Sequence, residues 1–337
     1  MATFVRTQEV AHEIGERGRF ALRVTSPDVQ MRADDGTVAR VRISFEIRAT
    51  TDAEADEIFD RLRFRVTEGN GALEVAEPRH GSGAGLGSLV RLFGMGSGQV
   101  DTNVEVDAPR LSDLRFDGVS ADLTAIGFRG LQEYRTVSGD LVLDGTGGEV
   151  RIKGVSSDIS LRAEAPLGSL DINTVSGDIS AFAPRIEQLR AATVSGDVEL
   201  EGILADGPEH RIETVSGDAS LGVVDDMTLE VRGLSTDADV RLPHRSEGTR
   251  DRRRYVIGNG GTQLLFSSMS GDIEIRPPRR TGDTPPPPPA APSPPAPPRP
   301  PSIDDDDQLT VLRALERGEI DVEEATRRLG GGRGSGV

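Results

Sequence analysis

The sequence predicts an all-β protein, a single-stack parallel β-solenoid with about eight rungs of 18–21 residues. Three observations predict this fold: a four-residue unit recurs along the chain, apolar residues alternate around it with period two, and large side chains are scarce. Only 4% of the 337 residues are aromatic, whereas 40 are glycine. Stacked layers that each bury a few aliphatic side chains suit this composition better than one large core does.

The recurring unit is Val-Ser-Gly-Asp or a close variant of it. Successive copies begin 18, 18, 20, 19, 21, 19 and 35 residues apart, and the long step carries an insertion around 245–259 that is rich in Arg and Gly. The copies begin at Val119, Val137, Val155, Val175, Val194, Val215, Leu234 and Met269. This spacing indicates an array of rungs that stack about 4.8 Å apart in parallel ladders.

The alternation around each copy predicts which side chains face the interior. If the first residue of a copy is position 0, apolar or small residues fall at positions 0, 2, 4 and 6, and upstream at −5 and −3. Position −1 is always Gly, Thr or Ser, which indicates a corner between two strands. We therefore expect Val at position 0 and the small residue at position 2 to point inward. Ser at position 1 and Asp at position 3 should point outward, and position 2 should be small because the interior is narrow there.

The outward aspartates form a predicted column with carboxylates about 5 Å apart. One interpretation is structural, because Asp and Ser side chains commonly bind backbone amides at bends. The other is a ligand-binding or Ca²⁺-binding ladder, because regularly spaced hard oxygen ligands suit that ion. The candidate metal ligands are Asp140, Asp158, Asp178, Asp197 and Asp218.

The region before the repeat, residues 1–110, is expected to be a β-rich cap. Thr51 and Glu54 have the spacing of a capping box, which predicts a helix with Ala55, Phe59 and their neighbours on one face. Such a helix would cover the open end of the solenoid, whose edge is otherwise unpaired. The repeat itself is assigned to residues 111–276.

Behind the repeat the composition changes to a Pro-rich linker (277–303), a helical hairpin (304–330) and a disordered tail (331–337). Leu309, Leu312 and Leu315 form an apolar stripe on the first predicted helix, and Leu329 lies on the second. Two short helices bury too little apolar area to be stable alone. We therefore expect these leucines to mediate self-association or docking to another protein.

Charge and composition exclude several classes of function. The net charge of −17 argues against nucleic-acid binding and limits membrane contact to a peripheral one. Because cysteine is absent and the four histidines lack metal-ligand spacing, no catalytic or cofactor-binding residue is expected, and the protein is not expected to be an enzyme. His210 falls in an apolar column and is interpreted as a partly buried structural residue. The chain starts without a signal peptide, which predicts a cytoplasmic protein with at most peripheral envelope association.

The iterated Thr-Val-Ser-Gly-Asp-(Ile/Val) units resemble those of the bacterial β-strand-repeat family called "putative adhesin" or toastrack, over roughly residues 20–276. Residues 305–330 are similar to the short two-helix module called SHOCT-like. The first resemblance implies a β-helix-like solenoid and a role in envelope-associated assembly or stress response, with no catalytic residues.

Together these expectations describe a non-enzymatic scaffold that self-associates through the solenoid ends and the C-terminal helices. The alternative is an adhesin-like protein that binds a glycan or calcium along the outer Ser/Asp ladder.

Overall fold

The computed structural model describes residues 2–78, 100–223, 226–249 and 252–278. The predicted linker from residue 279 onward, the helical hairpin with Leu309, Leu312, Leu315 and Leu329, and the tail lie outside the described residues.

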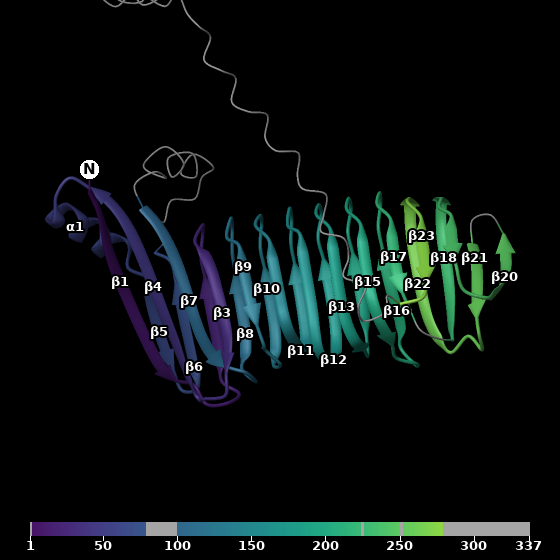
Figure 1. Ribbon diagram of the computed structural model, residues 1–337, viewed down its shortest axis with the longest axis horizontal. Helices are drawn as coiled ribbons and strands as arrows, with labels where there is room; N and C mark the ends of the chain where they lie inside the picture. Colours follow the sequence, from purple (N-terminus) through teal and green to yellow (C-terminus); the bar gives the residue numbers. More distant parts are fainter. Residues whose placement is uncertain (1, 79–99, 224–225, 250–251, 279–337) are drawn as a thin grey trace, which may run out of the picture. The chain divides into compact units, whose positions relative to one another are not determined.

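Two ladders of mostly parallel strands run side by side through the repeat region (Figure 1). The ladder before the corner, called the upstream ladder, contains β8 (Asp113–Asp117), β10 (Leu131–Arg135), β14 (Leu189–Ala192) and β16 (Glu209–Glu213). The ladder after the corner, the downstream ladder, contains β9 (Leu123–Ile126), β13 (Ile179–Ile186), β15 (Val198–Leu204) and β17 (Ala219–Gly222). The long strands β11 (Leu141–Lys153) and β12 (Ile159–Asn173) contribute to both ladders. The predicted all-β solenoid is confirmed.

The core lies between the two ladders and is built from the positions that the alternation predicts. In one rung Leu141 and Leu143 of the downstream ladder and Val150 and Ile152 of the upstream ladder are all buried. Each pairs in register with its counterpart in the next rung, such as Ile152 with Ile172. Because every strand turns one apolar side inward, the stack buries a continuous aliphatic core.

The stack also includes strands from before residue 111. β2 (Arg19–Arg23) pairs with β8 and with β6 (Ala72–Ala76), and β3 (Asp28–Asp34) pairs with β9 and with β7 (Val100–Pro109). The register aligns Phe20 with Leu114 and Val29 with Leu123. Ser26 and Asp28 therefore occupy the Ser and Asp places of a repeat whose sequence, Thr-Ser-Pro-Asp, has diverged. The N-terminal region thus contributes rungs to the stack in addition to covering its end.

The rung that comes last in the sequence does not lie last in the stack. β22 (Thr262–Ser270) pairs with β16 on one side and with β18 (Met227–Ser235) on the other. Likewise β23 (Ile273–Arg276) lies between β17 and β19 (Ala238–Val240). The insertion in the long step forms a hairpin of β20 (His244–Thr249) and β21 (Arg252–Ile257), and β21 pairs antiparallel with β18. This hairpin extends the upstream ladder beyond the last rung.

Antiparallel strands and one helix cover the N-terminal end of the stack. β4 (Val38–Ala49) pairs with β7, β1 (Ala2–Glu13) pairs with β4, and β5 (Arg65–Gly69) pairs with β6. α1 (Asp52–Leu62) begins as predicted, with the Thr51 hydroxyl accepting a hydrogen bond from Glu54 N at 3.2 Å. Its Phe59 packs edge-on against Phe45 of β4, with ring centroids 5.4 Å apart. No helix in the described part of the chain has the length and hydrophobicity needed to cross a membrane.

Candidate functional site

A recurring backbone hydrogen bond joins the corner of one rung to the corner of the next. The Ser at position 1 donates its N–H to the carbonyl of position 0 in the preceding rung, as Ser138 does to Val119 (2.7 Å) and Ser216 to Val194 (2.9 Å). These serines form a continuous column of parallel bridges: Ser120, Ser138, Ser156, Ser176, Ser195, Ser216 and Ser270. The repeat unit therefore lies at one place on every rung, and each of its side chains forms a column of its own.

The predicted aspartates lie together in such a column, with a defined structural role. Oδ1 of Asp197 accepts a hydrogen bond from Asp218 N at 2.9 Å, and Oδ1 of Asp178 accepts one from Asp197 N at 2.8 Å. The same contact joins Asp122 to Asp140, Asp158 to Asp178, Asp218 to Asp272 and Asp272 to Asp237, at 2.8–2.9 Å. These carboxylates thus each satisfy a backbone amide of the neighbouring rung; Asp140 takes part through its own N–H, which donates to Asp122. This agrees with the structural interpretation, with the bound amide one rung away.

Position 2 is small because backbones approach closely there. A Cβ on Gly196 would lie 2.2 Å from the carbonyl oxygen of Gly177, and one on Gly217 would lie 2.2 Å from that of Gly196. Both glycines also have positive φ, 146° and 155°. The predicted reason, a narrow interior, was therefore wrong: the carbonyl oxygen of the neighbouring rung leaves no room for a Cβ at these glycines. Ala121 and Ser157 occupy this position with ordinary φ, as expected from their side chains.

The prediction that Val at position 0 points inward was wrong. The position-0 side chains are exposed by 42% at Val215 to 57% at Met269, whereas the preceding residue is buried, as Thr136 and Thr193 are at 4%. The inward alternation of the upstream strand continues through position −1, so the chain turns at positions 0 and 1, one residue later than expected. At Thr136 the buried hydroxyl has a partner at the corner, because its Oγ1 donates to the Ser138 carbonyl at 3.0 Å. The buried Thr193 Oγ1 has no hydrogen-bond partner among the described residues.

The exposed apolar side chains of the corner form a column that we call the valine ridge. It consists of Val119, Val137, Val155, Val175, Val194, Val215 and Met269. Composition and alternation did not reveal this surface, because the same valines fit an inward strand position equally well. The signal that could have found it is the conservation of a hydroxyl or glycine at position −1 across copies, combined with an unbroken period of two from position −5.

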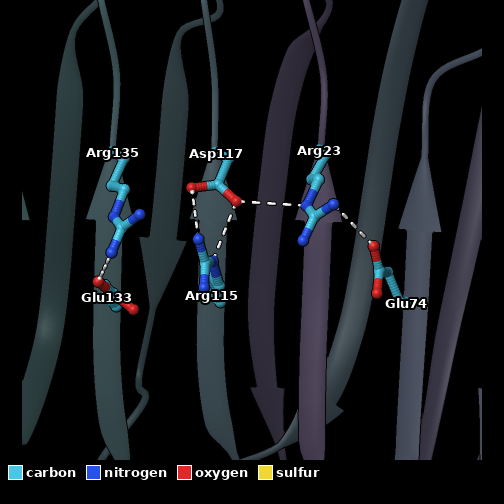
Figure 2. Close-up of polar contacts among 6 residues, drawn as sticks. All are labelled: Arg23, Glu74, Arg115, Asp117, Glu133 and Arg135. Carbon is cyan, nitrogen blue, oxygen red and sulfur yellow. Dashed lines mark hydrogen bonds and ion pairs between the residues drawn. The ribbon is translucent and has the colours of Figure 1, made fainter. Parts of the chain in front are cut away.

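A second polar feature lies on the outer face of the upstream ladder, near its N-terminal end (Figure 2). The guanidinium of Arg23 lies between Glu74 (3.2 Å) and Asp117 (3.4 Å), and Arg115 binds Asp117 at 3.0 Å. The hydrogen bond to Asp117 raises the pKa of Arg115 above its ordinary value. In the next rung, Arg135 forms an ion pair with Glu133 on the same strand, β10. Charges of both signs neutralise one another across the ladder, so this face presents no net cation or anion site.

The groove beside these residues has a volume of about 550 Å³. Side chains of both charges line it, namely Arg23, Arg65, Arg115, Glu74, Glu77 and Asp117. The Glu77 carboxylate already accepts a hydrogen bond from Thr25 N at 2.5 Å. Within the described ranges, no group of three or more His, Asp or Glu side chains has a geometry that could hold a metal ion.

His210 and Tyr134 are titratable side chains with no exposed surface. His210 is fully buried, with Nδ1 accepting from Leu189 N (3.2 Å) and Nε2 donating to the Ala205 carbonyl (2.8 Å), and burial lowers its pKa. It is a structural residue, as expected, and more deeply buried than predicted. Tyr134 is also buried, which raises its pKa, and its hydroxyl donates to Gln132 Oε1 at 3.0 Å. Both groups are satisfied internally and neither faces a surface.

Comparisons with known proteins give a family and a set of structures of similar topology. A crystal structure of a "putative lipid binding protein" from Parabacteroides distasonis is 13% identical, covering 81% of this chain and 96% of its own, with a TM-score of 0.45. A "putative adhesin" from Parabacteroides merdae is 11% identical over 81% and 96%, with a TM-score of 0.33. A "putative cell adhesion protein" from Clostridium sporogenes is 10% identical over 80% and 99%, with a TM-score of 0.27.

No protein of curated function matches the chain at a significant level. The profile of the family described as Toastrack DUF4097 matches residues 20–276, which span the diverged β2–β3 rung and every copy of the repeat. The chain belongs to the Toastrack DUF4097 family.

Proposed function

We propose that the protein is a non-enzymatic scaffold that holds copies of itself or partner proteins together, in bacterial envelope organisation or stress response. The observation that carries this proposal is the repetition of the corner: six consecutive rungs present Val, Ser and Asp side chains at the same place, and the next presents Met, Ser and Asp. The aspartates of the repeat use a carboxylate oxygen to join rungs. A regular column of this kind suits side-on contact along the stack.

The N-terminal end of the stack is covered, which favours contacts elsewhere on it. There the side chain of Gln8 in β1 donates to the Phe64 carbonyl (3.0 Å) and accepts from Phe64 N (2.9 Å), which satisfies a backbone that would otherwise be open. At the other end the β20–β21 hairpin lies on the edge of β18, and among the described strands β20 pairs with β21 alone. We therefore place the scaffold's contacts on the corner columns, on the C-terminal leucines and at this C-terminal end of the solenoid.

The size of the full chain in solution tests the scaffold role. We expect light scattering of the full chain to show oligomers that become smaller when Leu312→Asp introduces a charge into the predicted apolar stripe. Thr310→Asp is the matched control, because it adds the same charge beside the stripe. An unmodified chain that stays an ideal monomer at high concentration would contradict the proposal.

The second candidate is adhesin-like binding of calcium or a glycan along the aspartate column, which the exposure of the Ser and Asp side chains favours. The Tm of the protein, measured during a calcium titration, tests whether the aspartate column binds this ion. A rise in Tm that Asp197→Asn weakens would support binding at the column, and an unchanged Tm would leave the carboxylates only their structural role.

A further inference from the structure

The valine ridge is an apolar surface with no covering element in the described part of the chain. Its seven members occupy consecutive rungs, and each is about half exposed. At about 4.8 Å per rung the ridge is roughly 29 Å long. Scattered exposed aliphatic side chains are common on proteins, but a contiguous row in register is typical of an interaction surface.

The two flanks of the ridge differ in charge. On one side lie the uncharged Ser column and then the aspartate column, with one carboxylate per rung. On the other side lie the outward residues at position −2, two residues before each valine. This column contains two cations, two anions and three uncharged residues, so it has no net charge. Its members are Asp117, Arg135, Lys153, Asn173, Ala192, Glu213 and Ser267.

The spacing of the ridge selects its partner. A partner that contacts every rung must repeat at about 4.8 Å, the distance between strands of a ladder. An α-helix advances 5.4 Å per turn and drifts out of register within a few rungs, and residues of an extended peptide on one face lie about 6.6 Å apart. A second copy of this chain has the required repeat, because the same ladder produces it.

We propose that two copies of this protein associate along their valine ridges, parallel and with equal rungs facing each other. A two-fold axis parallel to the stack places the aspartate column of one copy opposite the position −2 column of the other. Asp140 then faces Arg135 of the other copy, and Asp158 faces Lys153. Like charges meet at the Val119 and Val215 rungs alone, whereas an antiparallel pair brings like charges together at every rung. An antiparallel pair would place the two aspartate columns against each other, which like-charge repulsion disfavours.

This inference deepens the scaffold role, because it names one of the surfaces through which copies assemble. It remains separable from association through the C-terminal leucines, since Leu312→Asp changes the predicted helices and leaves the ridge intact.

Single cysteines provide the test, because the chain has none of its own. We expect Val137→Cys, Val175→Cys and Val215→Cys each to form a disulfide-linked dimer of the full chain at least tenfold faster than Val142→Cys. Val142 is the control, being equally apolar and 40% exposed, but on the outer face of β11. The result should be the same in the Leu312→Asp background.

Three outcomes would overturn the proposal. In the first, the ridge cysteines react no faster than Val142→Cys. In the second, Val175→Cys alone forms cross-links, which indicates an antiparallel pair; in the third, cross-linking disappears in the Leu312→Asp background.

Substitution of the ridge provides an independent measurement. Threonine keeps the branched shape of valine and replaces one of its two methyl groups with a hydroxyl, so the triple change Val137→Thr, Val175→Thr and Val194→Thr should leave the fold intact. We expect it to weaken dimerisation more than tenfold in sedimentation equilibrium, with Val142→Thr unchanged. Equal dimer constants for both variants would contradict the ridge as the interface.

Discussion

At the scale of single residues, the glycine column shows how tightly successive rungs approach. A Cβ added to Gly196 would be 2.2 Å from the carbonyl oxygen of Gly177 in the neighbouring rung. No rotamer change can relieve this clash, because the obstructing atom belongs to the backbone of the neighbouring rung. The corner therefore tolerates a side chain only where the local backbone differs, as at Ala121 and Ser157.

We predict that Gly196→Ala destabilises the fold by about 2–4 kcal/mol, because it combines an unfavourable φ with a backbone clash. Gly168→Ala is the control: its added Cβ would meet no atom closer than 3.7 Å, and we expect a change within about 0.5 kcal/mol. Urea unfolding of the two variants gives the comparison. Equal unfolding free energies of the two variants would show that neighbouring rungs can move apart at Gly196 without loss of stability.

His210 makes stability depend on pH. Its Nδ1 accepts and its Nε2 donates a hydrogen bond in the buried site, so protonation of Nδ1 breaks the contact with Leu189 N. Because burial lowers the pKa in the folded state, the unfolded chain binds the proton first, at its ordinary pKa of about 6.5. The contribution is fully present above that pH and is lost as the pH falls below it.

We predict that unfolding free energy falls between pH 7 and pH 5 by at most about 1.4 kcal/mol per pH unit through this group. His210→Gln keeps one donor and one acceptor without titrating, so the difference between the two proteins should change over this range. Chemical denaturation at pH 7, 6 and 5 measures it. A constant difference would show that His210 does not control the pH dependence.

At the scale of elements, strand pairing at the C-terminal side places β22 between β16 and β18. The reason is the hairpin β20–β21, which takes the outer edge of β18 and leaves its inner edge for β22. The order also departs from the sequence at the other end, where β2 lies between β6 and β8 although it precedes both in the chain. On the C-terminal side a later strand fills a gap between two earlier ones, whereas at the N-terminal end later strands are added on both sides of β2.

Engineered disulfides test this order of rungs. Ser216 and Ser270 form a parallel bridge, so their Cα atoms are close to the separation that a disulfide spans. We predict that Ser216→Cys with Ser270→Cys forms an intramolecular disulfide and raises Tm. Ser216→Cys with Ser235→Cys, two rungs apart, should stay reduced under the same oxidation. Bond formation in the second pair alone would mean that rungs stack in chain order.

At the scale of the whole stack, each rung contacts only its two neighbours, so stability depends on position along the ladder. Central rungs such as β11–β12 are covered on both sides. Among the described strands β20 pairs with β21 alone, and all of its side chains are exposed.

We predict a gradient of amide exchange, slowest in β11 and β12 and fastest in β20, measured by hydrogen–deuterium exchange of the full chain. The covered N-terminal end, where α1 packs on β4, should exchange more slowly than β20. Uniform protection along the stack would indicate one fully cooperative unit instead of nearest-neighbour coupling.

Much of the architecture is contained in the sequence because alternation is a local property of a strand. Positions −5, −3, 4 and 6 were assigned correctly to the core, and Thr51 with Glu54 located the helix. The diverged rung at Ser26 and Asp28 was missed because Thr25 and Pro27 replace the residues that mark the repeat. The columns of the candidate site were predicted, but the valine column was assigned to the wrong face.

The sequence by itself determined the repeat, the two-strand rung, the aspartate column and the helical cap, since each depends on residues close together in the chain. Only the tertiary structure decided that Val137 and its equivalents face outward, that Gly196 meets a carbonyl of the next rung, and that β22 lies between β16 and β18. The physical reason is that these three features depend on contacts between rungs, where the approach of two backbones fixes where the chain turns and which edge remains free to pair.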